Sequence, residues 1–307
     1  MVDGSFRLPR RRFIGLASAM VAAPMVSSFG FGGIAGAAEK KRDLKKAVKI
    51  GMVKEGNTLL EKFQLLADLG FDGVELDSPN NLSLDEVLAA KKETGLEIPG
   101  VVNSVHWGKP LSHPDEAVRR AGREGLETAL RDAKSYGATT ALLVPAVVTK
   151  EVSYADAYKR SQDEIRKVLP LAEELGIKIA FENVWNQFLL SPIEAARYVD
   201  EFESKYVGWY FDVGNIVNYG WPEQWVDILG SRILKLDIKE YSRKRRDGEG
   251  LWKGFGVKLL EGDCDWPSVM KALDRIGFTG WGTAEVSGGD RARLADIAER
   301  MDRIYAS

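Results

Sequence analysis

One alternation runs through most of the chain and constrains its fold more than any other feature. Short runs rich in β-branched and apolar residues are each followed by a longer stretch with helical spacing, such as TLLEKFQLLADLG. From Ala47 onward we find eight such runs: Val48–Val53, Gly73–Asp77, Ile98–Ser104, Thr139–Pro145, Ile177–Asn183, Val207–Val213, Arg232–Ile238 and Gly280–Val286. Eight strand–helix units over roughly 260 residues predict a single α/β domain, a (β/α)8 or TIM barrel.

A doubly wound open sheet would show the same alternation of strands and helices. The first run is not followed by a glycine-rich phosphate-binding loop, however, which argues against a dinucleotide-binding sheet. Several helical stretches end on a glycine, for example Gly70 and Gly137, as expected where a helix must stop before the next strand. We therefore favour the closed barrel.

The N-terminal segment differs from the rest of the chain. Arg10 and Arg11 precede a weakly apolar stretch that is interrupted by glycines, and Ala35 to Ala37 form a small-x-small cleavage pattern. We interpret 1–37 as a twin-arginine signal peptide and 38–307 as the exported barrel, which would be periplasmic or extracellular. An uncleaved anchor or a basic tail are alternatives, but the apolar stretch is short for a membrane span.

The composition limits the partners that we expect. The hydrophobic content of 45%, the charged content of 29% and the formal net charge of −2 are ordinary for a globular protein. No basic stripe appears, so nucleic acid is not expected, and a membrane would be contacted only through the export signal. The single Cys264 excludes an internal disulfide and a multi-cysteine metal site. The sequence leaves open whether the chain forms a homo-oligomer.

Four acidic residues come at the ends of the last four expected strands. They are Glu182, Asp212, Asp237 and Glu285. In a TIM barrel the functional residues come from these strand ends, so the four carboxylates should converge. They would repel one another unless a divalent cation binds, and an all-oxygen site favours Mg²⁺ or Mn²⁺.

Each acid could instead cap a helix or form a local ion pair with Lys235, Lys239 or Arg243. Four acids at matched strand ends favour the metal site over this alternative. Lys235 precedes Asp237 by two residues, so both side chains should face inward, with Lys235 one layer deeper as a candidate counter-ion.

Several segments carry a family resemblance. EGLETALRDAKSYGATTALLVP, FENVWNQFLLSP, YFDVGN and LLEGDCDWPSVMKALDRIGFTGWGTAE resemble the sugar phosphate isomerase/epimerase proteins of the xylose isomerase-like TIM barrel superfamily. D-Tagatose 3-epimerases and L-xylulose-5-phosphate 3-epimerases belong to it. The resemblance extends from about Val48 to the C-terminus.

The resemblance implies one divalent metal held by Glu, Asp, His and Glu on the last four strands. Glu182, Asp212 and Glu285 match three of these ligands, whereas the segment LKLDIKE offers Asp237 where the family has histidine. Asp237 either keeps the ligation with oxygen or marks an altered site. The resemblance also implies that Glu182 and Glu285 transfer the proton of a ketose through a cis-enediolate.

Further positions are candidates for substrate binding. Asn215 stands where family members often have a substrate-contacting histidine, Arg243 matches the family's substrate-binding arginine, and Glu75 resembles its frequent glutamate on the second strand. His106 and Trp107 follow the third strand on the catalytic side, and Trp185 and Trp252 could line the pocket with apolar faces.

Export bears on the substrate, because sugar phosphates are cytoplasmic metabolites. We therefore expect a divalent-metal-dependent epimerase or isomerase that acts on an unphosphorylated keto-sugar. A metal-dependent lyase, or deglycosidase, that eliminates the aglycone of a 3-keto-glycoside is the first alternative. A non-catalytic sugar-binding barrel is the second, motivated by Asp237 and Asn215.

Overall fold

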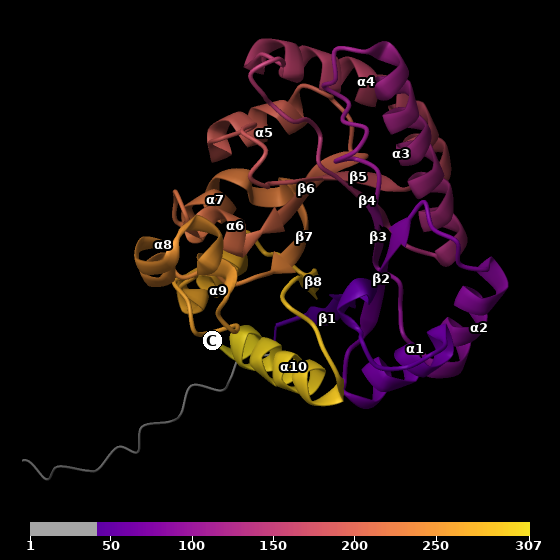
Figure 1. Ribbon diagram of the computed structural model, residues 1–307, viewed down its shortest axis with the longest axis vertical. Helices are drawn as coiled ribbons and strands as arrows, with labels where there is room; N and C mark the ends of the chain where they lie inside the picture. Colours follow the sequence, from indigo (N-terminus) through magenta and orange to yellow (C-terminus); the bar gives the residue numbers. More distant parts are fainter. Residues whose placement is uncertain (1–41) are drawn as a thin grey trace, which may run out of the picture. The chain divides into compact units, whose positions relative to one another are not determined.

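Residues 42–307 are described in the computed structural model, and they form a closed barrel of eight parallel strands (Figure 1). The strands are β1 (Leu44–Lys49), β2 (Gly73–Ser78), β3 (Gly100–Asn103), β4 (Thr140–Leu143), β5 (Lys178–Glu182), β6 (Val207–Asp212), β7 (Ile233–Ile238) and β8 (Gly280–Ala284). Each strand pairs with the next along the chain, and β1 pairs with β8 to close the barrel. The predicted TIM barrel is confirmed, while the expected signal peptide lies outside the described residues.

Helices follow the strands and surround the barrel (Figure 1). The longer helices are α1 (Leu59–Asp68), α2 (Leu84–Thr94), α3 (Glu116–Tyr136), α4 (Tyr154–Leu175), α5 (Pro192–Asp200), α7 (Pro222–Leu229), α9 (Trp266–Arg275) and α10 (Arg291–Ala306). The shorter ones are α6 (Val213–Val217) and α8 (Arg243–Glu249), with 3₁₀ turns η1 (Ile50–Met52), η2 (Gly230–Arg232) and η3 (Leu251–Phe255). Among residues 42–307, no helix has the length and apolar character that a membrane crossing would need.

Local sequence signals explain where the helices begin and end. Thr58 and Ser153 accept hydrogen bonds from the first turns of α1 and α4, so each satisfies a backbone N–H that the helix leaves free. Gly137 and Gly176 follow α3 and α4 with φ of 77° and 71°, a left-handed conformation that costs glycine little. Each long helix can therefore stop abruptly and return the chain to the next strand.

The first strand lies earlier in the chain than the expected Val48–Val53. Pairing with β8 runs from Leu44 to Val48 and includes Lys45 and Lys46, whose ammonium groups form ion pairs outside the barrel. The apolar residues that continue beyond the strand form η1 instead. As a result, Lys49 becomes the last residue of β1 and lies at the carboxyl end of the barrel.

The barrel interior is filled below this end. The Tyr210 hydroxyl donates a hydrogen bond of 2.8 Å to Glu75 Oε2, and Lys235 Nζ lies 3.6 Å from Glu75 Oε1. All three side chains are buried. They fill the barrel interior beneath the strand ends.

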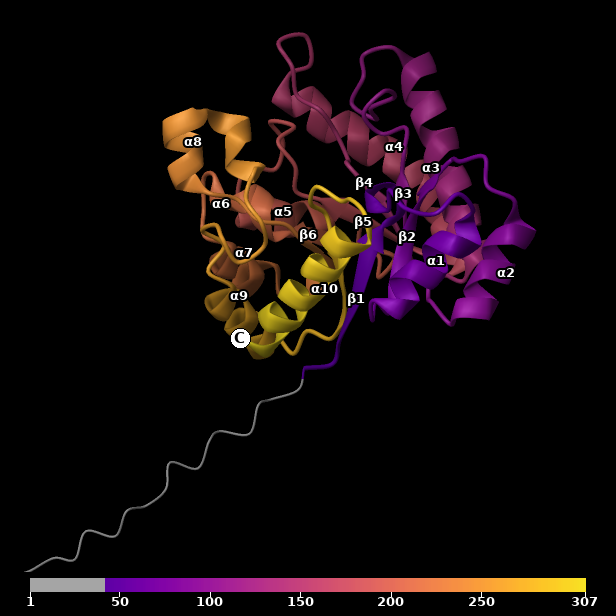
Figure 2. The ribbon, with the colours of Figure 1, turned by 60° about the horizontal axis from the view of Figure 1, so that its bottom comes forward.

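The connection between β7 and α9 is the longest loop at the carboxyl end of the barrel, and it contains α8 and η3. In Figure 2, α8 stands toward the carboxyl ends of the strands. Glu240, just after β7, is buried and holds the returning chain: its Oε2 accepts from Leu260 N at 2.8 Å and from Trp266 Nε1 at 2.9 Å. This anchoring keeps Trp252 and Phe255 of η3 at the cavity.

Candidate active site

The four acidic residues that the sequence singled out meet at the carboxyl end of the barrel. Each offers a carboxylate oxygen, and these oxygens all lie within 4.8 Å of one another. Glu182 and Asp212 end β5 and β6, Asp237 is the penultimate residue of β7, and Glu285 directly follows β8. Four neighbouring parallel strands thus deliver one carboxylate each, in what we call the carboxylate cluster.

An amide next to the cluster fixes one of its members. Asn183 follows Glu182, and its Oδ1 accepts hydrogen bonds from Asp212 N and Trp209 Nε1, both at 3.0 Å. Its Nδ2 donates to Asp212 O at 2.7 Å. Asp212 Oδ1 in turn accepts from Asn215 N at 2.9 Å, which caps α6. The end of β5 therefore supplies Glu182 to the cluster, and the following Asn183 holds the backbone of Asp212, the next member.

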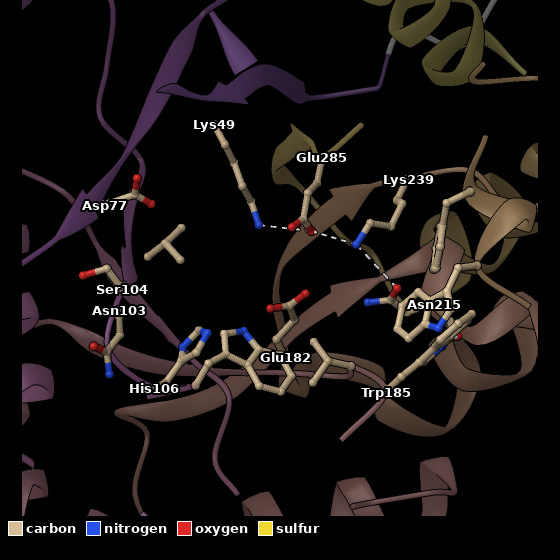
Figure 3. A pocket seen from close by; sticks show the side chains of 15 residues that line it. Lys49, Asp77, Asn103, Ser104, His106, Glu182, Trp185, Asn215, Lys239 and Glu285 are labelled. Atoms are coloured by element: carbon tan, nitrogen blue, oxygen red, sulfur yellow. Dashed lines mark hydrogen bonds and ion pairs between the residues drawn. The ribbon is translucent and has the colours of Figure 1, made fainter. Parts of the chain in front are cut away.

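Two lysines lie inside the carboxylate cluster: Lys49, which no sequence pattern singled out, and Lys239, which was expected only as an alternative ion-pair partner of one acid. Lys49 Nζ is 3.0 Å from Asp237 Oδ2 and 3.2 Å from Glu285 Oε2. Lys239 Nζ is 2.9 Å from Asp212 Oδ2 and 3.1 Å from Glu285 Oε2. Figure 3 shows both side chains reaching Glu285 from opposite sides, with Glu182 facing them. Each ammonium thus bridges two acids.

Without a bound cation the carboxyl groups have very different proton affinities. Burial, followed by the charge of Glu285, raises the pKa of Glu182 to about 8. Burial raises the pKa of Asp237 well above its usual range, even though Lys49 opposes this. Burial also acts to raise the pKa of Glu285, but Lys49 and Lys239 outweigh it and hold that pKa at about 2. The cation-free cluster therefore stores protons on some acids while Glu285 stays ionised.

The cluster has the donor atoms that a divalent cation requires. It offers four carboxylates and no sulfur or nitrogen ligand, which suits a hard ion such as Mg²⁺ or Mn²⁺. Asp237 Oδ1 is buried and has no hydrogen-bond partner among the described residues, so it has an unused acceptor. The residues present therefore fit a divalent ion.

A cavity of about 570 Å³ opens above the cluster. Its lining combines charged residues at the base with aromatic residues around them (Figure 3): Lys49, Asp77, Val102, Asn103, Ser104, His106, Trp107, Glu182, Val184, Trp185, Asn215, Lys239, Trp252, Phe255 and Glu285. Trp185 packs on Trp252 and Phe255 with ring centroids 4.8 and 4.9 Å apart. Polar groups and aromatic faces together are the usual components of a carbohydrate site.

His106 and Trp107 both line this cavity. In Figure 3, His106 lies on the opposite side of the cavity from Trp185. His106 Nδ1 accepts a hydrogen bond of 3.3 Å from Val144 N, so the neutral ring carries its proton on Nε2. Burial, followed by the charge of Lys49, lowers the pKa of His106 to about 4. The ring is therefore a neutral hydrogen-bond donor near neutral pH.

Two of the predicted substrate-binding residues lie away from the cavity lining. Glu75 is in the middle of β2 and contacts Tyr210 and Lys235 one layer below. The Arg243 guanidinium donates to Val217 O at 2.9 Å and to Gly220 O at 2.7 Å, so it ties α8 to the chain after α6. Asn215, Trp185 and Trp252, in contrast, do line the cavity.

Four residues of the lining were not predicted from the sequence: Lys49, Asp77, Asn103 and Ser104. Asp77 and Asn103 lie at the carboxyl ends of β2 and β3, so the strand-end rule could have identified them. Identifying Lys49 as a cavity residue would have required the correct bounds of β1. Lys239 was considered only as a partner of a single acid.

Comparison with known proteins agrees with this architecture. The family model described as "Xylose isomerase-like TIM barrel" matches residues 63–306. A curated relative, L-ribulose-5-phosphate 3-epimerase UlaE of Escherichia coli (strain K12), is 27% identical over 280 residues, which cover 86% of this chain and 96% of the relative.

Two solved structures share the fold at low sequence identity. A D-psicose 3-epimerase crystallised in the presence of D-fructose superposes with a TM-score of 0.69 at 19% identity, covering 84% of this chain and 97% of that one. The 3-keto-D-glucoside 4-epimerase YcjR from E. coli superposes with a TM-score of 0.71 at 18% identity, covering 86% and 99%. Since the family model spans well over half of the sequence and the barrel is complete, this chain belongs to the xylose isomerase-like TIM barrel family.

Proposed function

We propose that the protein is a divalent-metal-dependent epimerase or isomerase of an unphosphorylated keto-sugar. The observation that carries this proposal is that Glu182 and Glu285 both line the cavity and both belong to the carboxylate cluster. The relatives named as sugar 3-epimerases support the same reaction class.

The chemistry is proton transfer beside a carbonyl. One of the two glutamates, as carboxylate, takes the proton from the carbon next to the ketone, and the C–H electron pair becomes the C=C bond of a cis-enediolate. The other, as carboxylic acid, returns a proton to the same carbon from the opposite face and so inverts it. A bound divalent ion, held by the cluster, would polarise the carbonyl. Among the lining residues, His106 supplies a neutral hydrogen-bond donor to the sugar oxygens.

The charges of the cavity favour a substrate without phosphate. Phosphate recognition normally uses a free cation or an arginine fork. Within the described residues, the cations of the lining are Lys49 and Lys239, and both are already paired with carboxylates. UlaE is named for a sugar phosphate, so we propose that this chain differs from that relative in its substrate.

One observation favours elimination from a 3-keto-glycoside as a second candidate. Trp107 and Trp252 line the cavity with 52% and 68% of their surface exposed, which leaves aromatic area for a second ring or an aglycone. YcjR is named for a 3-keto-D-glucoside, although at 18% identity it supports only the shared fold. The same proton abstraction would then expel the aglycone. A barrel that binds sugar without turnover is the remaining alternative.

We also propose that 1–37 direct export by the twin-arginine route and that the mature barrel begins at about residue 38. Arg10, Arg11 and the cleavage pattern at Ala35 to Ala37 support this. An exported enzyme meets free sugars and glycosides rather than sugar phosphates, in agreement with the paired lysines of the cavity.

A substrate panel tests the proposed function. The mature protein, loaded with Mn²⁺ or Mg²⁺, is incubated in D₂O with free ketoses, ketose phosphates and a 3-keto-glycoside, and the products are followed by NMR. We expect a free ketose to epimerise with incorporation of one deuterium, and we expect Glu182→Gln and Glu285→Gln to abolish it. Release of an aglycone would establish the lyase instead, and binding without either product would leave a sugar-binding protein.

A further inference from the structure

Lys49 and Lys239 are built into the carboxylate cluster from two different strands. Lys49 ends β1 and Lys239 follows β7, yet both ammonium groups reach Glu285 Oε2, at 3.2 and 3.1 Å. Each also contacts a second, fully buried acid: Asp237 for Lys49 and Asp212 for Lys239. A pair of cations that share one carboxylate is costly unless the surrounding negative charge is high.

The remaining surroundings of both ammonium groups keep them at the cavity. Lys49 Nζ lies 5.8 Å from the Tyr210 ring centroid, and Lys239 Nζ lies 5.4 Å from that of Phe255. Lys239 Nζ is also 3.4 Å from Asn215 Oδ1. Aromatic faces and an amide oxygen hold cations without adding charge. Both lysines line the cavity, so they face whatever binds there.

The charge of the cluster shows why two lysines are useful. When all four carboxylates are ionised, as ligation of a divalent ion requires, they and the two ammonium groups carry a formal charge of −2, which that ion cancels. Without the lysines the same ion would leave a surplus of negative charge, which would oppose the formation of an enediolate. The two ammonium groups thus neutralise the negative charge that a single divalent ion leaves on the cluster.

We propose that Lys49 and Lys239 are resident cations of the metal centre with two roles. They compete with the divalent ion for oxygens of Asp237, Asp212 and Glu285, and they bind oxygen atoms of a polyhydroxy ketone in the cavity. The second role rests on the proposed function, whereas the first does not. Removing one ammonium should therefore strengthen metal binding and weaken turnover.

Two single variants test both roles. Lys49→Met and Lys239→Met keep the aliphatic stem and remove the charge. Mn²⁺ affinity of the metal-free mature protein is measured by titration calorimetry, and turnover of the ketose found active with the parent is measured at saturating Mn²⁺. We expect Mn²⁺ to bind about tenfold to a hundredfold more tightly, because repulsion between like charges a few ångströms apart is removed. Turnover should fall by at least about tenfold.

Lys46→Met is the matched control. Lys46 is also a lysine of β1 in an ion pair with one carboxylate, Asp302, but it lies outside the cluster. This variant should bind Mn²⁺ and turn over substrate as the parent does. Lys49→Arg keeps the charge, and it should keep the Mn²⁺ affinity within about threefold of the parent.

The outcomes separate the two roles from each other and from the proposed function. Unchanged or weaker Mn²⁺ binding in folded Lys49→Met and Lys239→Met would overturn the competition. Unchanged turnover at saturating Mn²⁺ would overturn the contact with substrate. If the parent converts no sugar at all, the proposed function fails, while the Mn²⁺ titrations still decide the first role. If a methionine variant does not fold, the corresponding glutamine variant, Lys49→Gln or Lys239→Gln, is measured in its place.

Discussion

Lys49 of β1 extends past β8 to Asp237 of β7, and their charged atoms lie 3.0 Å apart although the two strands are not neighbours in the barrel. Asp237 is therefore held by a cation on one side while its Oδ1 has no hydrogen-bond partner in the described part of the chain. This arrangement leaves Oδ1 as an unused acceptor for an ion, whereas an ion that also binds Oδ2 must displace Lys49.

Substitution of Asp237 tests this division. We expect Asp237→Ala to lower Mn²⁺ affinity by at least about tenfold, because one hard ligand is lost. Asp237→His should keep a metal but shift its preference toward Zn²⁺, since imidazole is the softer ligand. Competition titrations of Mn²⁺ against Zn²⁺ measure both effects, with Asp247→Ala in α8 as an exposed control. Parent-like Mn²⁺ binding by Asp237→Ala would mean that Asp237 is not a ligand.

The buried pair below the cluster should respond differently to single and double substitution. Lys235→Met leaves the carboxylate of Glu75 buried without its cation, and we expect it to lower the free energy of unfolding by about 3 kcal/mol. Glu75→Gln with Lys235→Met removes both charges and should recover most of this loss. Urea unfolding of the metal-free proteins measures it. A double variant that is no more stable than Lys235→Met would show that the two charges do not interact.

His106 should make the metal-free protein sensitive to acid. Its pKa is about 4 in the folded chain and about 6.5 when unfolded, so the unfolded chain binds more protons between these values. Stability is thus lost as the pH falls from 6.5 toward 4.

The measurement is the difference in unfolding free energy between pH 7 and pH 4.5. His106→Asn should lose about 2–3 kcal/mol less than the parent over this interval, because about two pH units of it lie between the two pKa values and each contributes about 1.36 kcal/mol. His113→Asn, which removes the other histidine of the chain, is measured alongside it as the control. Equal losses in the parent and in His106→Asn would exclude this role.

The export proposal is tested in a bacterial host that has the twin-arginine pathway. Replacing Arg10 and Arg11 by lysine should keep the full-length chain in the cytoplasm, whereas the parent should appear outside it with a new N-terminus near Ala38. Cell fractionation and N-terminal sequencing report this. Export of the double variant at the level of the parent would contradict the assignment.

The strand-end acids were predictable because the carboxyl ends of all strands of a TIM barrel meet at one end of it. Glu182, Asp212 and Glu285 could therefore be grouped without knowing how the strands pair. Lys49 could not, because its position depends on the pairing of β1 with β8, which spans almost the whole chain.

The partner of Lys235 shows a similar limit. The pleat correctly predicts that Lys235 lies deeper than Asp237, but strand alternation does not tell which residue faces it across the barrel. That residue is Glu75, from the far side of the sheet, and Asp237 pairs with Lys49 instead. Side-chain partners across a closed barrel depend on the stagger of its strands, which no local pattern encodes.

The layer of Glu75, Tyr210 and Lys235 fills the barrel beneath the carboxylate cluster, and the cavity lies on the other side of the cluster, among the loops at the carboxyl ends of the strands. Sugar must enter and leave past the same aromatic rim, and the two epimers differ at only one carbon. Product that has not yet departed therefore excludes the next substrate molecule. Product and substrate therefore compete for the same cavity, and accumulated product should inhibit the forward reaction competitively.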